Sequence, residues 1–137
     1  MSTRVKDRKN NNKFEILTKI TNLCGRTRDI VNHEKFNANV ALRTDLINSA
    51  EAIYFFARRA NRYRTDRTKE ELLKRRELQN KAIDRCDWFF GEVQETKPVF
   101  HLRTKQVESW GRQIEEVQDA LRAWRDGDAD RWRTNHR

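Results

Sequence analysis

One apolar pattern near the end of the chain constrains its fold more than any other feature. Six apolar residues follow one another at intervals of three, four, three, four and three: Val107, Trp110, Ile114, Val117, Leu121 and Trp124. This spacing puts all six on one stripe of an α-helix and is typical of helices that pack side by side. We therefore predict a helix over about residues 102–125. Asp126 and Gly127 are expected to end it, because glycine readily adopts the left-handed cap conformation.

Two earlier stretches show the same helical spacing. The first covers about residues 13–32, and its stripe consists of Phe14, Leu17, Ile20, Cys24 and Val31, with Thr27 between them. The second covers about residues 38–64, and its stripe consists of Leu46, Ala50, Ile53, Ala57 and Ala60. Tyr54, Phe55 and Phe56 widen its apolar face, which favours contact with more than one neighbour.

A third stretch, over about residues 68–96, begins with a capping box in which Thr68 and Glu71 bind each other's backbone amides. We expect Pro98 to stop this helix. Its predicted stripe is Leu72, Ile83, Cys86, Phe90 and Val93, with Trp88 and Phe89 beside it.

The four helices together predict an all-α protein, an antiparallel up-down four-helix bundle over residues 13–126. We expect a basic disordered arm over residues 1–12 and a short tail over residues 127–137. Only 4 Gly and 1 Pro occur in 137 residues, which argues against a β-sandwich or barrel. No apolar run approaches the roughly 18 residues of a membrane span, and no apolar stretch follows the basic start of the chain, so we expect a cytoplasmic protein.

The residues that could carry chemistry are few and scattered. His33, His101 and His136 fall in or next to predicted links or the tail, and none pairs with a carboxylate or cysteine at metal-ligand spacing. Cys24 and Cys86 sit on apolar faces and are expected to be buried free thiols. We therefore predict a protein that is not an enzyme and needs neither cofactor nor metal.

The charge is more informative, because the chain carries a formal +9 and much of it is concentrated. Between Arg58 and Arg76 there are nine Lys or Arg residues and three Asp or Glu residues. Such a cluster favours a polyanion as partner, and arginine binds phosphate with two parallel hydrogen bonds. The alternative interpretations are a solvated face with pairs such as Glu70–Lys74, or an acidic protein partner. The predicted nucleic-acid-binding residues are Arg58, Arg59, Arg62, Arg64, Arg67, Lys74, Arg75, Lys81 and Arg85.

The tryptophans divide into two groups. Trp110 and Trp124 lie on the regular stripe and are predicted to be core residues. Trp88 and Trp132 fit the stripes less well, and they could cap the core, stack on bases or form an interface between subunits.

Several features in this order resemble a known family. They are the small-residue helix ending in Ala60-Asn61-Arg62, the basic turn, the Lys97-Pro98 link and the closing stretch from Trp110 to Trp132. From about Phe14 to Trp132 the chain resembles the accessory variability determinant (Avd) proteins of diversity-generating retroelements.

The resemblance implies a four-helix bundle that assembles as a homopentamer with a basic surface. It also implies two partners, the retroelement reverse transcriptase and the template RNA, and a role in the synthesis of mutagenised cDNA. By its position, Arg85 matches a basic residue on the third helix of that family. A related alternative is the bundle family encoded in ribosomal RNA intervening sequences. The second helix of that family usually carries an Asn-Ile-Ala-Glu-Gly-like run, where this chain has residues 58–62.

Overall fold

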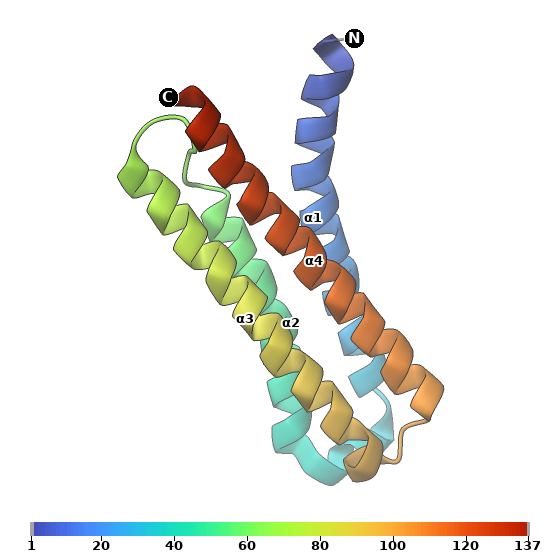
Figure 1. Cartoon of the computed structure of the whole chain (residues 1–137). Helices are drawn as coiled ribbons and strands as arrows, with labels where there is room; N and C mark the ends of the chain where they lie inside the picture. Colours follow the sequence, from blue (N-terminus) through green and yellow to red (C-terminus); the bar gives the residue numbers. More distant parts are fainter. Residues whose placement is uncertain (1, 137) are drawn as a thin grey trace.

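A computed structural model of the chain describes the backbone of residues 2–136 and the side chains of residues 15–136. Its helices are α1 (Ser2–Val31), the short 3-10 helix η1 (Glu34–Asn39), α2 (Val40–Ala60), α3 (Lys69–Phe100) and α4 (Thr104–Asn135). The described part contains no strand, so the all-α prediction is confirmed, and α1 to α4 pack as a four-helix bundle (Figure 1). The backbone of residues 2–12, predicted as a disordered arm, forms the first turns of α1.

The two ends of the bundle carry different links. The C-terminal end of α4 lies beside the link between α2 and α3, whereas η1 lies at the opposite end with the link between α3 and α4 (Figure 1). No helix in the described residues combines the length and the apolar character that a membrane span requires.

The core confirms the two regular stripes. All six stripe residues of α4 are buried, and so are the five of α2. Trp110 is fully buried, donates its indole N–H to the Thr27 hydroxyl at 3.3 Å and meets the Phe89 ring edge to face. Buried indoles need such a partner, so this contact fixes α4 against α1 and α3.

The stripes of α1 and α3 are displaced from those predicted. In α1 the buried apolar residues are Ile16, Ile20, Leu23 and Val31, while Leu17 and Cys24 lie at the margin of the core. In α3 Phe89 is fully buried and Phe90 only partly. Each of these helices offers adjacent apolar residues, so periodicity alone does not decide which one faces inward.

The prediction that Pro98 stops the third helix is wrong. Helix α3 contains Pro98 and continues to Phe100, ending at His101, which has a left-handed φ of 56°. Proline removes the hydrogen bond to the carbonyl four residues earlier, which belongs to the exposed Gln94 and remains open to water. The last turn is held by Phe100, which is buried against Phe36 with ring centroids 4.3 Å apart.

The predicted end of the last helix at Gly127 is also wrong. Helix α4 continues to Asn135, and Gly127 has no positive φ. Asp128, the next residue, is buried and bonded to α3, so the helix gains a buried ion pair by continuing. Residues 127–135, predicted as a tail, are therefore helical.

Candidate nucleic-acid interface

The link between α2 and α3 presents the predicted basic cluster at one end of the bundle. Arg58 and Arg59 lie in the last turn of α2, where positive charge is favoured by the partial negative charge of the helix C-terminus. Helix α3 begins after Thr68, whose hydroxyl accepts the Glu71 amide at 3.1 Å, which is one half of the predicted capping box. The other half is not observed, because the Glu71 carboxylate accepts no hydrogen bond from Thr68 and its Oε2 has no partner among the described residues. Arg62, Arg64 and Arg67 lie on the short link between Ala60 and Thr68.

Four arginines at the end of α2 and on this link form what we call the arginine quartet: Arg58, Arg59, Arg62 and Arg67. All four are exposed, and no carboxylate among the described residues lies within ion-pair distance of them. Arg59 lies over the Phe55 ring, with its guanidinium carbon 5.4 Å from the ring centroid. The quartet thus presents positive charge that the described part of the chain leaves unneutralised.

Three other predicted residues form ion pairs on the surface. Arg64 binds Asp66 at 2.9 Å, and Lys74 and Lys81 each reach a glutamate one turn earlier, at 3.3 and 3.6 Å. The hydrogen bond from Arg64 holds the pKa of Asp66 below its usual value. Exposed pairs of this kind are weak in water, so a phosphate can displace the carboxylate.

Arg75 does not belong to this surface, and the prediction that it does is wrong. Its side chain is 2% exposed, and its guanidinium binds the Asp128 carboxylate at 2.7 and 3.1 Å. It also donates to the Tyr63 carbonyl at 3.1 Å and packs on the Trp124 ring at 4.7 Å. Because α3 buries Arg75 on the same side as Leu78, a count of basic residues along the sequence cannot separate it from its exposed neighbours.

Asp128 is the residue beside the basic link that the sequence interpretation missed. It accepts hydrogen bonds from Arg75, from Gln79 at 2.8 Å and from Arg131, and it is 2% exposed. These contacts join α4 to α3, and Arg75 extends them to the backbone of the basic link. A signal was present, since Asp128 follows Trp124 by four residues and continues the regular stripe of α4.

Arg85 and Lys81 lie apart from the quartet. They follow Lys74 by 11 and 7 residues along α3, a distance of roughly 16 and 10 Å at 1.5 Å per residue. Arg85 is half-buried and donates from Nε to the Ser49 hydroxyl of α2 at 3.2 Å. The predicted residues therefore follow one side of α3 away from the link and do not form a single compact patch.

A buried carboxylate, that of Glu92, contacts the same Ser49 hydroxyl as Arg85. Glu92 is 7% exposed and accepts a hydrogen bond from the Ser49 hydroxyl. Burial raises the pKa of Glu92, an effect that the Ser49 hydroxyl and the Arg85 charge partly oppose and that Asp45 reinforces. The Ser49 hydroxyl thus bridges Arg85 to Glu92 between α2 and α3.

The raised pKa of Glu92 predicts a dependence of stability on pH. A carboxyl whose pKa is higher in the folded state stabilises the fold most below its unfolded value, and this contribution is lost as pH rises through the folded pKa. We expect Glu92→Gln to unfold at a urea concentration that falls less between about pH 4 and pH 7 than in the wild type. Equal changes in the two proteins would show that Glu92 contributes no such dependence.

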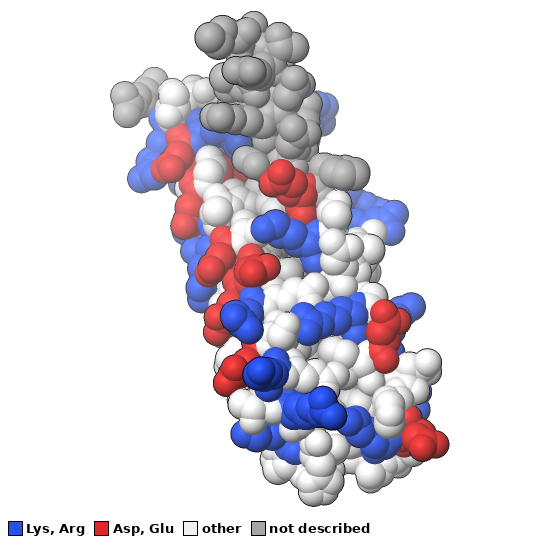
Figure 2. All heavy atoms as spheres, turned by 90° about the vertical axis from the view of Figure 1, so that its right-hand side faces the viewer, with Lys and Arg blue, Asp and Glu red and all other residues white. Residues whose placement is uncertain are grey.

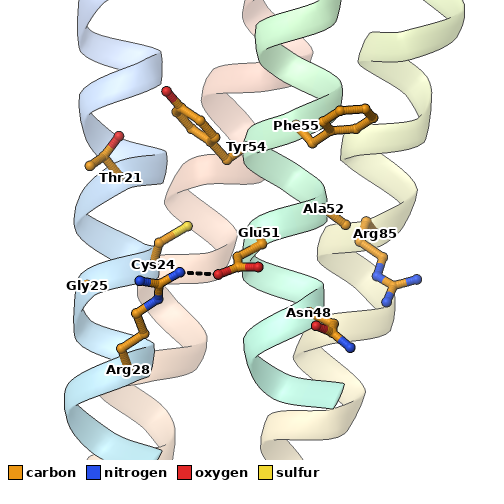
Figure 3. A pocket seen from close by; sticks show the side chains of 10 residues that line it. All are labelled: Thr21, Cys24, Gly25, Arg28, Asn48, Glu51, Ala52, Tyr54, Phe55 and Arg85. Carbon is orange, nitrogen blue, oxygen red and sulfur yellow. Dashed lines mark hydrogen bonds and ion pairs between the residues drawn. The ribbon is translucent and has the colours of Figure 1, made fainter. Parts of the chain in front are cut away.

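An open groove of about 930 Å³ adjoins Arg85 and crosses α2 (Figure 3). Arg28 of α1 and Glu51 of α2 form an ion pair across one side, while the Phe55 ring and Arg85 lie on the other (Figure 3). Its lining residues are Thr21, Cys24, Gly25, Arg28, Asn48, Glu51, Ala52, Tyr54, Phe55 and Arg85.

Positive charge is not confined to the end with the quartet. The face in Figure 2 mixes Lys and Arg with Asp and Glu, and the basic side chains gather towards its lower end. That end holds η1 and the link between α3 and α4, where Lys35 and Arg103 line a smaller cavity of about 470 Å³. A test of the quartet therefore needs this second basic region as its control.

The part of the chain that the structure describes contains no cluster of metal-binding side chains, and its two cysteines are free. No group of three or more His, Cys, Asp or Glu residues lies close enough there to hold a metal ion. His33, His101 and His136 are exposed. Both cysteines are unpaired, and burial raises the pKa of Cys86 to about 12, so its thiol stays protonated at neutral pH.

No protein-family model, curated protein or solved structure matches this chain with statistical significance.

Proposed function

We propose that this protein is a non-enzymatic accessory protein of a diversity-generating retroelement. In this proposal an antiparallel up-down four-helix bundle, assembled as a homopentamer in the cytoplasm, binds the template RNA and the reverse transcriptase. The polymerase carries out the chemistry, and the bundle positions the RNA beside it during mutagenic cDNA synthesis.

The arginine quartet is the observation that carries the proposal. Four exposed arginines at the end of α2 and on the link after it have no carboxylate partner among the described residues, so they are free to bind an anion. A phosphate backbone supplies such anions at regular intervals, and arginine binds each with paired hydrogen bonds. The sequence resemblance then supports one polyanion, the template RNA of a retroelement.

A pure protein-interaction scaffold is the second candidate, and the exposed apolar side chains favour it. Phe55 and Trp88 are 54% and 63% exposed, and such side chains on a helical bundle often mark contact with another protein. A bundle of the ribosomal RNA intervening-sequence family is a further alternative. If either alternative function is correct, the yield of cDNA does not depend on this protein.

A reconstituted reaction tests the proposal. The proposal requires that a retroelement reverse transcriptase be encoded near this gene. That enzyme is incubated with its template RNA, with and without the purified bundle, and the cDNA is measured on a gel. We expect full-length cDNA to rise at least tenfold when the bundle is present. Equal yields, together with no RNA binding by the bundle at about 50 mM salt, would contradict the proposal, because weak phosphate contacts are strongest at low salt.

A further inference from the structure

Two aromatic side chains of the described part are conspicuously outside the core. Phe55 on α2 is 54% exposed and Trp88 on α3 is 63% exposed, whereas Trp110 and Phe89 are fully buried. Burying a large aromatic side chain stabilises a fold by roughly 2–3 kcal/mol. Neither exposed ring contributes fully to the stability of the bundle, so another role has to account for them.

The two rings border the same surface of α2 and α3. Phe55 and Arg85 line the groove together, and the Phe55 ring points away from α1 (Figure 3). Arg85, Trp88 and Glu92 follow one another along one side of α3, at intervals of three and four residues. Arg85 and Glu92 both reach Ser49 of α2, so this side of α3 is the one that adjoins α2.

Arginines lie on or near both rings. The Arg59 guanidinium lies 5.4 Å from the centroid of Phe55, and Arg85 lies one helical turn from Trp88. Ser49 holds Arg85 through Nε alone, and among the described residues the other two guanidinium nitrogens make no hydrogen bond. The surface therefore offers aromatic faces together with groups that can bind phosphate.

We propose that Phe55 and Trp88 are stacking platforms for unpaired bases of a single-stranded RNA, whose phosphates are bound by Arg59 and Arg85. This inference rests on the proposed function and names the class of RNA that the bundle holds. Base stacking on aromatic rings beside a positively charged track is the mode by which proteins bind single strands without reading their sequence. A duplex keeps its bases stacked inside and cannot use the two rings.

The charges on this surface favour a single strand over a second copy of the chain. A chain with a formal charge of +9 repels a second copy of itself and attracts a polyanion. Here the Arg28–Glu51 pair and Arg85 line the groove itself, and Arg59 lies over one of the rings. A single-stranded RNA complements this surface, because its bases can stack on the rings and its phosphates can bind the arginines.

The test compares two RNAs with one double variant. Phe55→Leu/Trp88→Leu removes both aromatic faces and keeps the charge, and its binding to an unstructured 20-nucleotide RNA and to a duplex of the same length is measured by fluorescence anisotropy. We expect a loss of about 30-fold or more for the single strand and less than threefold for the duplex, because each stacked base contributes to binding. Phe55→Tyr/Trp88→Phe keeps both rings and is expected to bind the single strand within about threefold of the wild type.

Leu73→Ala/Val99→Ala is the matched control, since it alters two other exposed apolar residues of α3. We expect this control to bind both RNAs as the wild type does. A folded Leu double variant with unchanged affinity for the single strand would overturn the stacking inference while leaving the proposed function intact. A change in its mass by light scattering, with unchanged RNA affinity, would show that the rings form a contact between copies. Failure of the wild type to bind either RNA would instead contradict the proposed function.

Discussion

Replacing Asp128 with alanine is expected to lower the free energy of unfolding by about 3–5 kcal/mol. The substitution leaves the buried Arg75 guanidinium without its carboxylate and removes the acceptor of the Gln79 amide. Single domains are stable by only about 5–15 kcal/mol, so the variant should unfold at a much lower urea concentration or fail to fold. Circular dichroism of the helices during urea unfolding measures the loss.

Two further variants make this expectation specific. Asp126→Ala removes an exposed carboxylate that pairs with Arg125 nearby on α4, and it should change the free energy of unfolding by less than about 1 kcal/mol. Arg75→Met/Asp128→Leu removes both buried charges and should recover much of the stability that Asp128→Ala loses. A loss below about 1 kcal/mol for Asp128→Ala would show that the ion pair does not hold α4 to α3.

Replacing the whole arginine quartet with alanine is expected to lower the affinity for template RNA by roughly two to three orders of magnitude at about 0.1 M salt. Each guanidinium removed loses an exposed ion pair with a phosphate of at most about 1 kcal/mol, and about 1.4 kcal/mol corresponds to a tenfold change in affinity. The four side chains are exposed, so the helical content and the urea midpoint should stay close to those of the wild type. Filter binding with the full-length template RNA measures the affinity.

The matched control removes four charges from the opposite end of the bundle. Lys35, Arg103, Lys105 and Arg112 are exposed basic residues at or near η1 and the start of α4, and their joint change to alanine alters the net charge equally. We expect at most about a fivefold loss for this variant, because long-range attraction falls while the phosphate contacts remain. Equal losses in the two variants would show that net charge, and no particular surface, governs binding.

The sequence predicted the regular parts of the fold because their signals are local. The stripes of α2 and α4 repeat without interruption, and all their predicted residues are buried. The predicted ends of α3 and α4 are wrong because these ends depend on contacts with distant residues. Pro98 and Gly127 are local stop signals, and the burial of Phe100 and Asp128 against distant residues overrides them.

The candidate site was predictable as a charged segment but not residue by residue. The exposure of the quartet follows from its place in the last turn of α2 and on the short link after it. The burial of Arg75 depends on Asp128, which lies 53 residues away in the sequence, so no local pattern reveals the pair. The bridge from Arg85 through Ser49 to Glu92 likewise joins two helices and becomes visible only when they are packed.

The dependence of RNA affinity on salt tests most directly whether the quartet holds a phosphate backbone. Each phosphate contact on a single strand contributes roughly 0.7 to the slope of the logarithm of affinity against the logarithm of salt concentration. We expect the slope of the quartet variant to be shallower than that of the wild type by roughly 2–3. The slope of the control variant of the opposite end should differ from that of the wild type by no more than about 0.7, the value of one phosphate contact. Identical slopes for the wild type and the quartet variant would contradict the proposed RNA-binding surface.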